Sequence, residues 1–95
     1  METMESNKLI AEFMEYPNLG TEGDFSYLKY HKSWKWLMPV VEKIEDMGCE
    51  VVMTNGECTI SADGYYAKSL GKSRRSSTYD AVVEFIEWYN KNIVL

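Results

Sequence analysis

The sequence predicts an α+β domain in which three helices pack on a small, mainly antiparallel sheet built around a hairpin at residues 49–62. Two observations lead to this fold class. Apolar residues recur at helical spacing in three separate stretches of the chain. Between the second and third stretches, residues 55–56 (Asn-Gly) separate two runs of alternating apolar and polar residues, which is typical of a β-hairpin. A chain of 95 residues forms one domain, so we assign residues 6–95 to it and expect residues 1–5 to be a flexible N-terminus.

The first helix is expected over residues 6–16. Ser6 is a suitable N-cap, and Pro17 ends the helix because proline disfavours the helical conformation in the residue before it. The apolar stripe of this helix consists of Leu9, Ile10, Phe13 and Met14. Residues 17–24 have the composition of a loop, and weak alternation over residues 26–32 predicts a short extended segment.

The second helix is expected to follow Ser33, as its cap, and to end at Gly48 in the left-handed conformation that suits glycine. Its apolar stripe consists of Trp34, Leu37, Met38, Val41, Ile44 and Met47. Pro39 lies within this pattern, and a proline inside a helix costs about 3 kcal/mol. Either the helix begins near Trp36, which places the proline in its first turn, or Pro39 bends the helix and frees a carbonyl one turn earlier.

The hairpin sequence predicts its own register. A type I′ turn at residues 55–56 pairs Thr54 with Glu57, and the pairing continues outward to Cys49 and Ala62. One face, which we expect to be buried, then carries Cys49, Val51, Met53, Cys58, Ile60 and Ala62. In this register the two cysteines lie more than about a dozen ångström apart, whereas a disulfide needs Cα atoms within about 7 Å. Both thiols should therefore be free and buried.

A third strand is expected over residues 64–68 and a polar loop over residues 71–76. Ser77 is predicted to cap the last helix, with Asp80 completing a short form of the capping box. The apolar stripe of this helix consists of Tyr79, Val82, Phe85, Ile86, Tyr89 and Ile93. The side chains expected to meet in the core are Phe13, Val41, Ile60 and Phe85.

Charge is segregated along this acidic chain, whose net charge is −5. Residues 25–41 and residues 64–79 contain no acid, and they carry three and four bases respectively. The rest of the chain has three bases against fifteen acids, a net charge of −12. This asymmetry predicts an anion-facing surface on an acidic body. It also argues against binding to generic duplex DNA.

Several functional classes find no support in the sequence. No apolar run approaches the roughly 18 residues of a membrane span and no secretory signal is visible, so we expect a cytoplasmic protein. Two cysteines and the single His31 do not form a zinc pattern, and a buried cysteine is a poor nucleophile. We therefore expect no metal, no cofactor and no enzymatic activity.

The basic segments offer two ways of binding an anion. Residues 27–36 interleave aromatic and basic side chains, as single-stranded nucleic-acid binders do, although the aromatic residues can equally pack in the core beneath solvated lysines. Residues 71–73 (Gly-Lys-Ser) match the end of a phosphate loop, but Tyr66 stands where that motif needs its first glycine, which excludes a nucleotide hydrolase. The N-terminus of the last helix can still bind an anion, unless residues 71–76 are only a solvated loop. The candidate partner-binding or anion-binding residues are Lys29, Lys32, Lys35, Trp36, Lys68, Lys72, Arg74 and Arg75.

Residues 7–14, 33–45 and 81–90, at the three predicted helices, resemble small proteins encoded by tailed phages and prophages of Bacteroidetes. These proteins are in turn similar to the phage α/β/α sandwich domain family. The resemblance implies a phage accessory protein that acts on host machinery or on a defence system. The segments that carry the resemblance include no catalytic motif, and the resemblance does not extend to residues 64–76.

Three functional hypotheses follow. The first is a non-enzymatic phage-type protein that binds a host or anti-phage defence macromolecule, such as an RNA-guided nuclease or its RNA. The second is a sponge for a small anionic, nucleotide-like ligand, and the third is a structural or interaction protein. The positions of Trp36, Tyr65, Tyr66, Arg74 and Arg75 discriminate between them. A cluster beside a cleft favours the sponge, one open face favours a macromolecule, and a scattered or buried arrangement favours the structural role.

Overall fold

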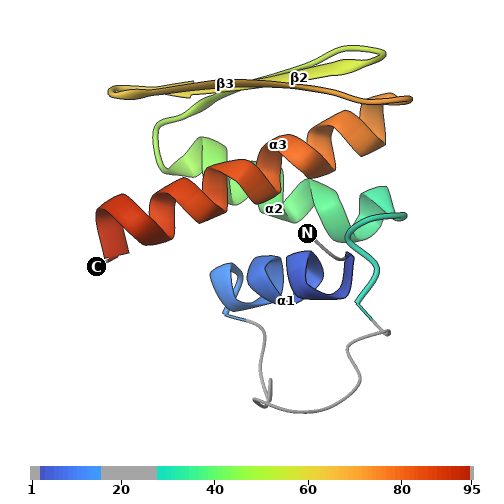
Figure 1. Ribbon diagram of the computed structural model, residues 1–95, viewed down its shortest axis with the longest axis horizontal. Helices are drawn as coiled ribbons and strands as arrows, with labels where there is room; N and C mark the ends of the chain where they lie inside the picture. Colours follow the sequence, from blue (N-terminus) through green and yellow to red (C-terminus); the bar gives the residue numbers. More distant parts are fainter. Residues whose placement is uncertain (1–2, 16–27, 95) are drawn as a thin grey trace.

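The α+β architecture is confirmed by a computed structural model, which describes residues 3–15 and 28–94. The elements in chain order are α1 (Thr3–Phe13), α2 (Trp34–Asp46), β1 (Glu50–Met53), β2 (Glu57–Ala62), β3 (Tyr65–Leu70), α3 (Arg74–Tyr89) and a π-helical turn, η1 (Asn90–Val94). Figure 1 shows the sheet as one layer, with α2 and α3 covering one of its faces. α1 lies on the side of these helices that faces away from the sheet and packs on α3.

The sheet is an antiparallel meander in the order β1-β2-β3. The register of the first hairpin is as predicted, from Met53 opposite Cys58 to Glu50 opposite Ser61. β1 begins at Glu50, so the predicted pair of Cys49 with Ala62 is not part of the ladder. β3 runs on to Leu70, two residues beyond the predicted end, because it pairs with the whole of β2.

The predicted type I′ turn is wrong, although Thr54 N does donate to the carbonyl of Glu57 at 2.9 Å. A type I′ turn needs a positive φ at both central residues, and neither Asn55 nor Gly56 has one. Tertiary contacts hold this turn instead. The carbonyl of Gly56 accepts a hydrogen bond from Gly71 N at 3.0 Å, in the chain that connects β3 to α3.

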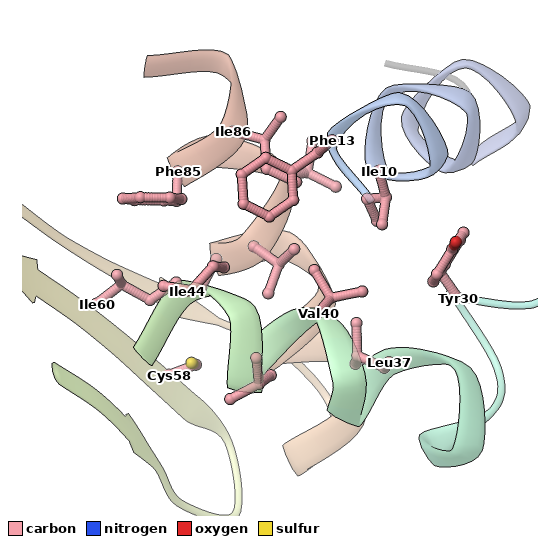
Figure 2. Close-up of a cluster of buried hydrophobic side chains, with 14 of the residues drawn as sticks. Ile10, Phe13, Tyr30, Leu37, Val40, Ile44, Cys58, Ile60, Phe85 and Ile86 are labelled. Atoms are coloured by element: carbon pink, nitrogen blue, oxygen red, sulfur yellow. The ribbon is translucent and has the colours of Figure 1, made fainter. Parts of the chain in front are cut away.

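The core lies between the covered face of the sheet and the three helices (Figure 2). Phe13 and Phe85 meet edge to face, with ring centroids 6.5 Å apart. The four residues predicted to form the core, Phe13, Val41, Ile60 and Phe85, are all buried in one cluster. The predicted alternation is confirmed in part, because Cys58 and Ile60 are buried while Val52 is half exposed. The other four residues of the expected buried face, Cys49, Val51, Met53 and Ala62, are only partly buried.

α2 begins directly after Ser33, whose extended backbone is that of an N-cap. Of the two alternatives for Pro39, the structure places the proline in the interior of the helix rather than in its first turn. The helix ends at Asp46, and Gly48 has the predicted left-handed conformation with φ of 93°.

The first helix differs from its prediction at both ends. It starts at Thr3, so residues 3–5 are helical although we expected them to be flexible, and it ends at Phe13 rather than at residue 16. The amino group of Lys43 on α2 donates to the carbonyl of Phe13, so a tertiary contact caps the helix before the proline is reached. Pro17 and the predicted loop at residues 17–24 lie outside the described residues.

The predicted extended segment at residues 26–32 is a turn where the structure describes it, over residues 28–32. Lys32 N donates to the carbonyl of Lys29 at 3.1 Å. Leu28 and Tyr30 are both buried, and this explains the weak alternation in the sequence.

The last helix starts at Arg74, four residues before the first helical residue that a Ser77 cap would allow. The N-cap is Ser73, which exchanges hydrogen bonds with Ser76 in a capping box. Ser77 is fully buried and donates back to the carbonyl of Ser73 at 3.0 Å, so it cannot act as the cap. Arg74 therefore lies in the first turn of a helix and not in the predicted loop.

Candidate nucleic-acid interface

The two basic segments, about 40 residues apart in the sequence, meet at one end of the molecule. Arg74 Nη2 donates to Asn55 Oδ1 at 3.5 Å, while the charge of Arg75 acts on His31, which lies between Lys29 and Lys32. In Figure 1, α2, α3 and the turn between β1 and β2 all have this end in common, at the right of the view. We call it the basic end. It carries Lys29, Lys32, Lys35, Lys72, Arg74 and Arg75.

Two helices begin at the basic end, and their amino termini add to its positive potential. The backbone N–H groups of a first helical turn lack a carbonyl partner four residues earlier, and a helix amino terminus carries roughly half a unit of positive charge. Two of these groups are occupied here, because Trp36 N donates to the carbonyl of Ser33 and Ser76 N donates to Ser73 Oγ. A first turn usually contains an acid that neutralises this charge, but the first turns of α2 and α3 contain none. The nearest acids along the two helices, Glu42 and Asp80, lie beyond the first turn.

The bases themselves differ in their surroundings. Lys32, Lys35, Lys72 and Arg74 are exposed, so an approaching anion meets them directly. Arg75 is partly buried, and within the described part of the chain its buried Nε has no hydrogen-bond partner.

Two predicted site residues do not belong to this cluster. Lys68 lies on the exposed face of β3, where its Nζ is 3.8 Å from the carboxylate of Glu57. Trp36 is in the first turn of α2, but its ring packs edge to face on Tyr30, with centroids 5.2 Å apart. Since Tyr30 is only 3% exposed, this pair belongs to the core.

A buried polar network holds the basic turn at residues 28–32 in place. Asn7 of α1 is 2% exposed and donates through Nδ2 to the carbonyl of Leu28 at 3.1 Å. The same amide group lies 2.9 Å from Nδ1 of His31. Asn7 Oδ1 accepts from the hydroxyl of Tyr79 on α3 at 3.0 Å. The network therefore joins α1, the basic turn and α3.

The charge state of His31 follows from this network. A carbonyl can only accept, so the bond to Leu28 directs the donor end of the Asn7 amide toward the turn, and Nδ1 of His31 must accept as well. Burial is the largest cause that lowers the pKa of His31 below 6.5, and three nearby positive charges lower it further. These charges are those of Lys32, Lys29 and Arg75. The histidine is thus held neutral, and the positive charge of the basic end comes from lysine and arginine.

The aromatic residues that we used as a discriminator are scattered. Trp36 packs against Tyr30, whereas Tyr65 packs at 5.5 Å from Phe85 under the sheet. Tyr66 is 67% exposed on the uncovered face of the sheet. Tyr30 is buried and Trp36 packs on it, so among the described residues 28–36 these two rings do not form an open stacking surface. By the criterion stated above, a scattered arrangement favours the structural or interaction hypothesis over the other two. The meeting of the two basic segments at one end of the molecule does not depend on where these aromatic residues lie.

A hollow of about 440 Å³ opens beside the basic end. It is lined by Trp34, Met38, Met53, Asn55 and Arg74, which come from α2, β1, the hairpin turn and α3. We did not identify Trp34 and Asn55 as site residues from the sequence, because the first lies on an apolar stripe and the second has an obvious role in a turn. Only the tertiary contact between the turn and α3 brings them together.

The thiols are free, as predicted, and Cys58 is buried. Cys49 is only partly buried, contrary to the prediction, because it precedes the first paired residue of β1. Burial raises the pKa of both thiols, so neither is activated as a nucleophile. Among the residues that the structure describes, no three His, Cys, Asp or Glu side chains are grouped so that they could hold a metal ion. Within the same residues, no helix is long and apolar enough to span a membrane.

No family model, curated protein or solved structure matches this chain.

Proposed function

We propose that this chain is a non-enzymatic, phage-type accessory protein that binds RNA, free or within a host or defence ribonucleoprotein, through the basic end. The convergence of the two basic segments at the amino termini of α2 and α3 carries this proposal. Lysine and arginine side chains neutralise phosphates and release counterions, which supplies most of the affinity in such complexes. Helix amino termini bind phosphate through their backbone N–H groups.

The acidic remainder of the molecule limits which nucleic acids can bind. Exposed acids follow the basic end along α2 and α3, where they begin with Glu42 and Asp80. A long duplex laid along the molecule would meet these carboxylates, whereas a compact RNA or a ribonucleoprotein can approach the basic end alone. Binding to generic duplex DNA should accordingly be weak.

A binding role fits the chemistry of the candidate nucleophiles better than catalysis does. The pKa of both thiols is raised by burial. Nδ1 of His31 accepts a hydrogen bond from the side-chain amide of Asn7, which leaves that nitrogen unable to act as a base. The phage-type role itself is supported by the resemblance of residues 7–14, 33–45 and 81–90, and inhibition of an RNA-guided nuclease is the defence-related activity that RNA binding would serve.

The test compares two charge-reversal variants. Arg74→Glu with Arg75→Glu alters the basic end, and Lys68→Glu with Lys91→Glu makes the same change in net charge on exposed residues elsewhere. The probe is labelled total RNA from the bacterial host. We expect the parent and the control to bind it, with an affinity that falls by roughly two to three orders of magnitude between 50 and 200 mM salt for about six phosphate contacts.

The variant at the basic end should lose this binding while its circular dichroism spectrum stays that of the parent. Equal loss in both variants would show that net charge, and not the basic end, governs the interaction. If both variants keep RNA binding, the proposal is wrong, and a structural or interaction role is then the better hypothesis.

The sponge for a small nucleotide-like anion has one observation in its favour, which is the hollow beside Arg74.

A further inference from the structure

The hollow beside the basic end combines the features that a nucleotide requires. Its walls are the indole of Trp34 and the side chains of Met38 and Met53, and its rim carries Asn55 and Arg74. Its volume of about 440 Å³ falls within the range of roughly 300–1,000 Å³ that is typical of small-molecule sites.

The apolar walls suit a flat aromatic ring. Trp34 is partly exposed at the hollow, so part of its ring remains available although the residue also packs on the core. Nucleobases stack on tryptophan, and thioether sulfur atoms make favourable contacts with aromatic rings. Met38 and Met53 therefore extend the stacking surface of Trp34 rather than block it.

The polar rim suits the edge of the base and the phosphate group of a nucleotide. The side-chain amide of asparagine offers a donor and an acceptor side by side, and this pair can read the edge of a base. Arg74 Nη2 lies 3.5 Å from Asn55 Oδ1, a weak contact that a ligand can replace. Arg74 also belongs to the first turn of α3, so a phosphate bound by its guanidinium would lie near a helix amino terminus.

A second hollow, at the other end of α3, lacks this combination. It has a volume of about 750 Å³ and is lined by Leu9, Glu87, Trp88, Asn90, Lys91 and Asn92. Glu87 would repel a phosphate there, and Lys91 is its single base.

We propose that the hollow binds one nucleotide, with the base against Trp34, the base edge read by the amide of Asn55, and the phosphate held by Arg74. The nucleotide is an unpaired residue of the RNA that the basic end binds, so this inference rests on the proposed function for the phosphate contacts. The exposed lysines of the basic end support an RNA source, because a single nucleotide would use Arg74 and leave Lys32, Lys35 and Lys72 without a role.

The experiment measures tryptophan fluorescence and affinity with three probes. The first is an RNA hairpin with an unpaired loop, the second is a blunt RNA duplex of the same stem, and the third is a mixture of the four nucleoside 5′-monophosphates. We expect the looped hairpin to bind at least tenfold more tightly than the blunt duplex and to quench the fluorescence, because stacking on Trp34 quenches the indole. Trp34→Phe should abolish that quenching.

Asn55→Ala tests the base edge, with Asn92→Ala as the matched control at the far end of the molecule. The first variant should lose the tenfold preference for the loop, and the second should keep it. Asn55 is exposed in a turn, so this test remains available even if Trp34→Phe does not fold.

The outcomes separate the hollow from the proposed function. Suppose that Arg74→Glu with Arg75→Glu abolishes RNA binding while Asn55→Ala keeps the preference for the looped hairpin. The nucleotide site in the hollow is then overturned, and the proposed function stands. Equal quenching by the monophosphates and the looped RNA supports the nucleotide site but overturns the RNA source in favour of a free nucleotide. If no RNA binds, the proposed function is overturned, and the absence of quenching by the monophosphates would then overturn the hollow as well.

Discussion

Asn7 shows how much depends on single residues in this small domain. Its side chain donates to Leu28 and His31 and accepts from Tyr79, so one amide on α1 binds partners on two other segments. Burial raises the pKa of Tyr79 to about 12, which keeps the phenol protonated and able to donate. None of this was predictable from the sequence. A single asparagine in a predicted helix forms no sequence pattern, and its partners lie 21, 24 and 72 residues away.

We predict that the pKa of His31 in the folded protein lies below 6.5, for the reasons of burial and nearby positive charge given above. The pKa of His31 in the unfolded chain is the ordinary histidine value of 6.5. As the pH falls below 6.5, the unfolded chain therefore binds a proton more readily than the folded protein does. The stability from this group is therefore present above pH 6.5 and is lost as the pH falls toward the pKa of the folded state. Because His31 is the only histidine, its ring protons give a single titration curve by NMR.

The matched variant is His31→Gln, which keeps an acceptor for Asn7 but cannot titrate. Its unfolding free energy should vary less between pH 5 and 7 than that of the parent. A histidine pKa at or above 6.5 would contradict the network as we describe it.

Among the elements, the strands and the end of α2 could be predicted from the sequence, whereas the junction between β3 and α3 could not. The hairpin register and the left-handed Gly48 were predictable, because local pattern and backbone conformation decide them. The start of α3 was not, because Ser73, Ser76 and Ser77 are all acceptable caps by composition. Only the burial of Ser77 decides between them. This shift moved Arg74 and Arg75 from a predicted loop onto a rigid helix.

The structure explains why residue 71 is a glycine, and the reason is packing rather than a phosphate loop. A Cβ atom there would lie 2.8 Å from the backbone N of Ser77 and 2.6 Å from the hydroxyl of Ser76. We predict that Gly71→Ala lowers the unfolding free energy by about 1–3 kcal/mol, because the backbone of α3 would have to move.

The control is Gly56→Ala, in the neighbouring turn. The nearest atom to a Cβ there is 3.5 Å away, and the φ of Gly56 is not positive, so this variant should stay within about 0.5 kcal/mol of the parent or gain stability slightly. Urea denaturation compares the two, and equal stabilities would show that the junction can relax around a methyl group.

The whole molecule has one covered and one uncovered face of its sheet, and it has one basic end. The charge segregation that led to the basic end was visible in the sequence, but the meeting of its two halves was not. Residues 29–35 lead into α2 and residues 72–75 lead into α3, and only the common orientation of the two helices in the fold places these segments together. A wet face of the sheet was predicted from the hairpin, but the exposure of Leu70 on it (68%) was not, because Leu70 lies beyond the strand that was predicted over residues 64–68.

Phe85 is the centre of the core, where its ring meets Phe13, Tyr65, Trp88 and Tyr89. We predict that Phe85→Ala costs roughly 3–5 kcal/mol, which is a large part of the stability of a domain this small. Thermal denaturation measures the effect.

Leu70→Ala, on the uncovered face, is the control, and it should change the stability by no more than about 0.5 kcal/mol. Melting temperatures within a few degrees of each other for the two variants would mean that Phe85 does not hold the core together.

The hydrogen bond between Tyr79 and Asn7 joins residues 72 positions apart, and it has a consequence for biosynthesis. Translation releases α1 from the ribosome well before α3, the helix on which it packs. The nascent chain must therefore carry Ile10 and Phe13 without their partners on α3 until α3 has left the exit tunnel. The sheet, by contrast, consists of consecutive hairpins and can close as soon as its strands emerge. A ribosome that stalls before α3 would leave a chain with an exposed apolar helix, which is the kind of surface that chaperones and proteases act on.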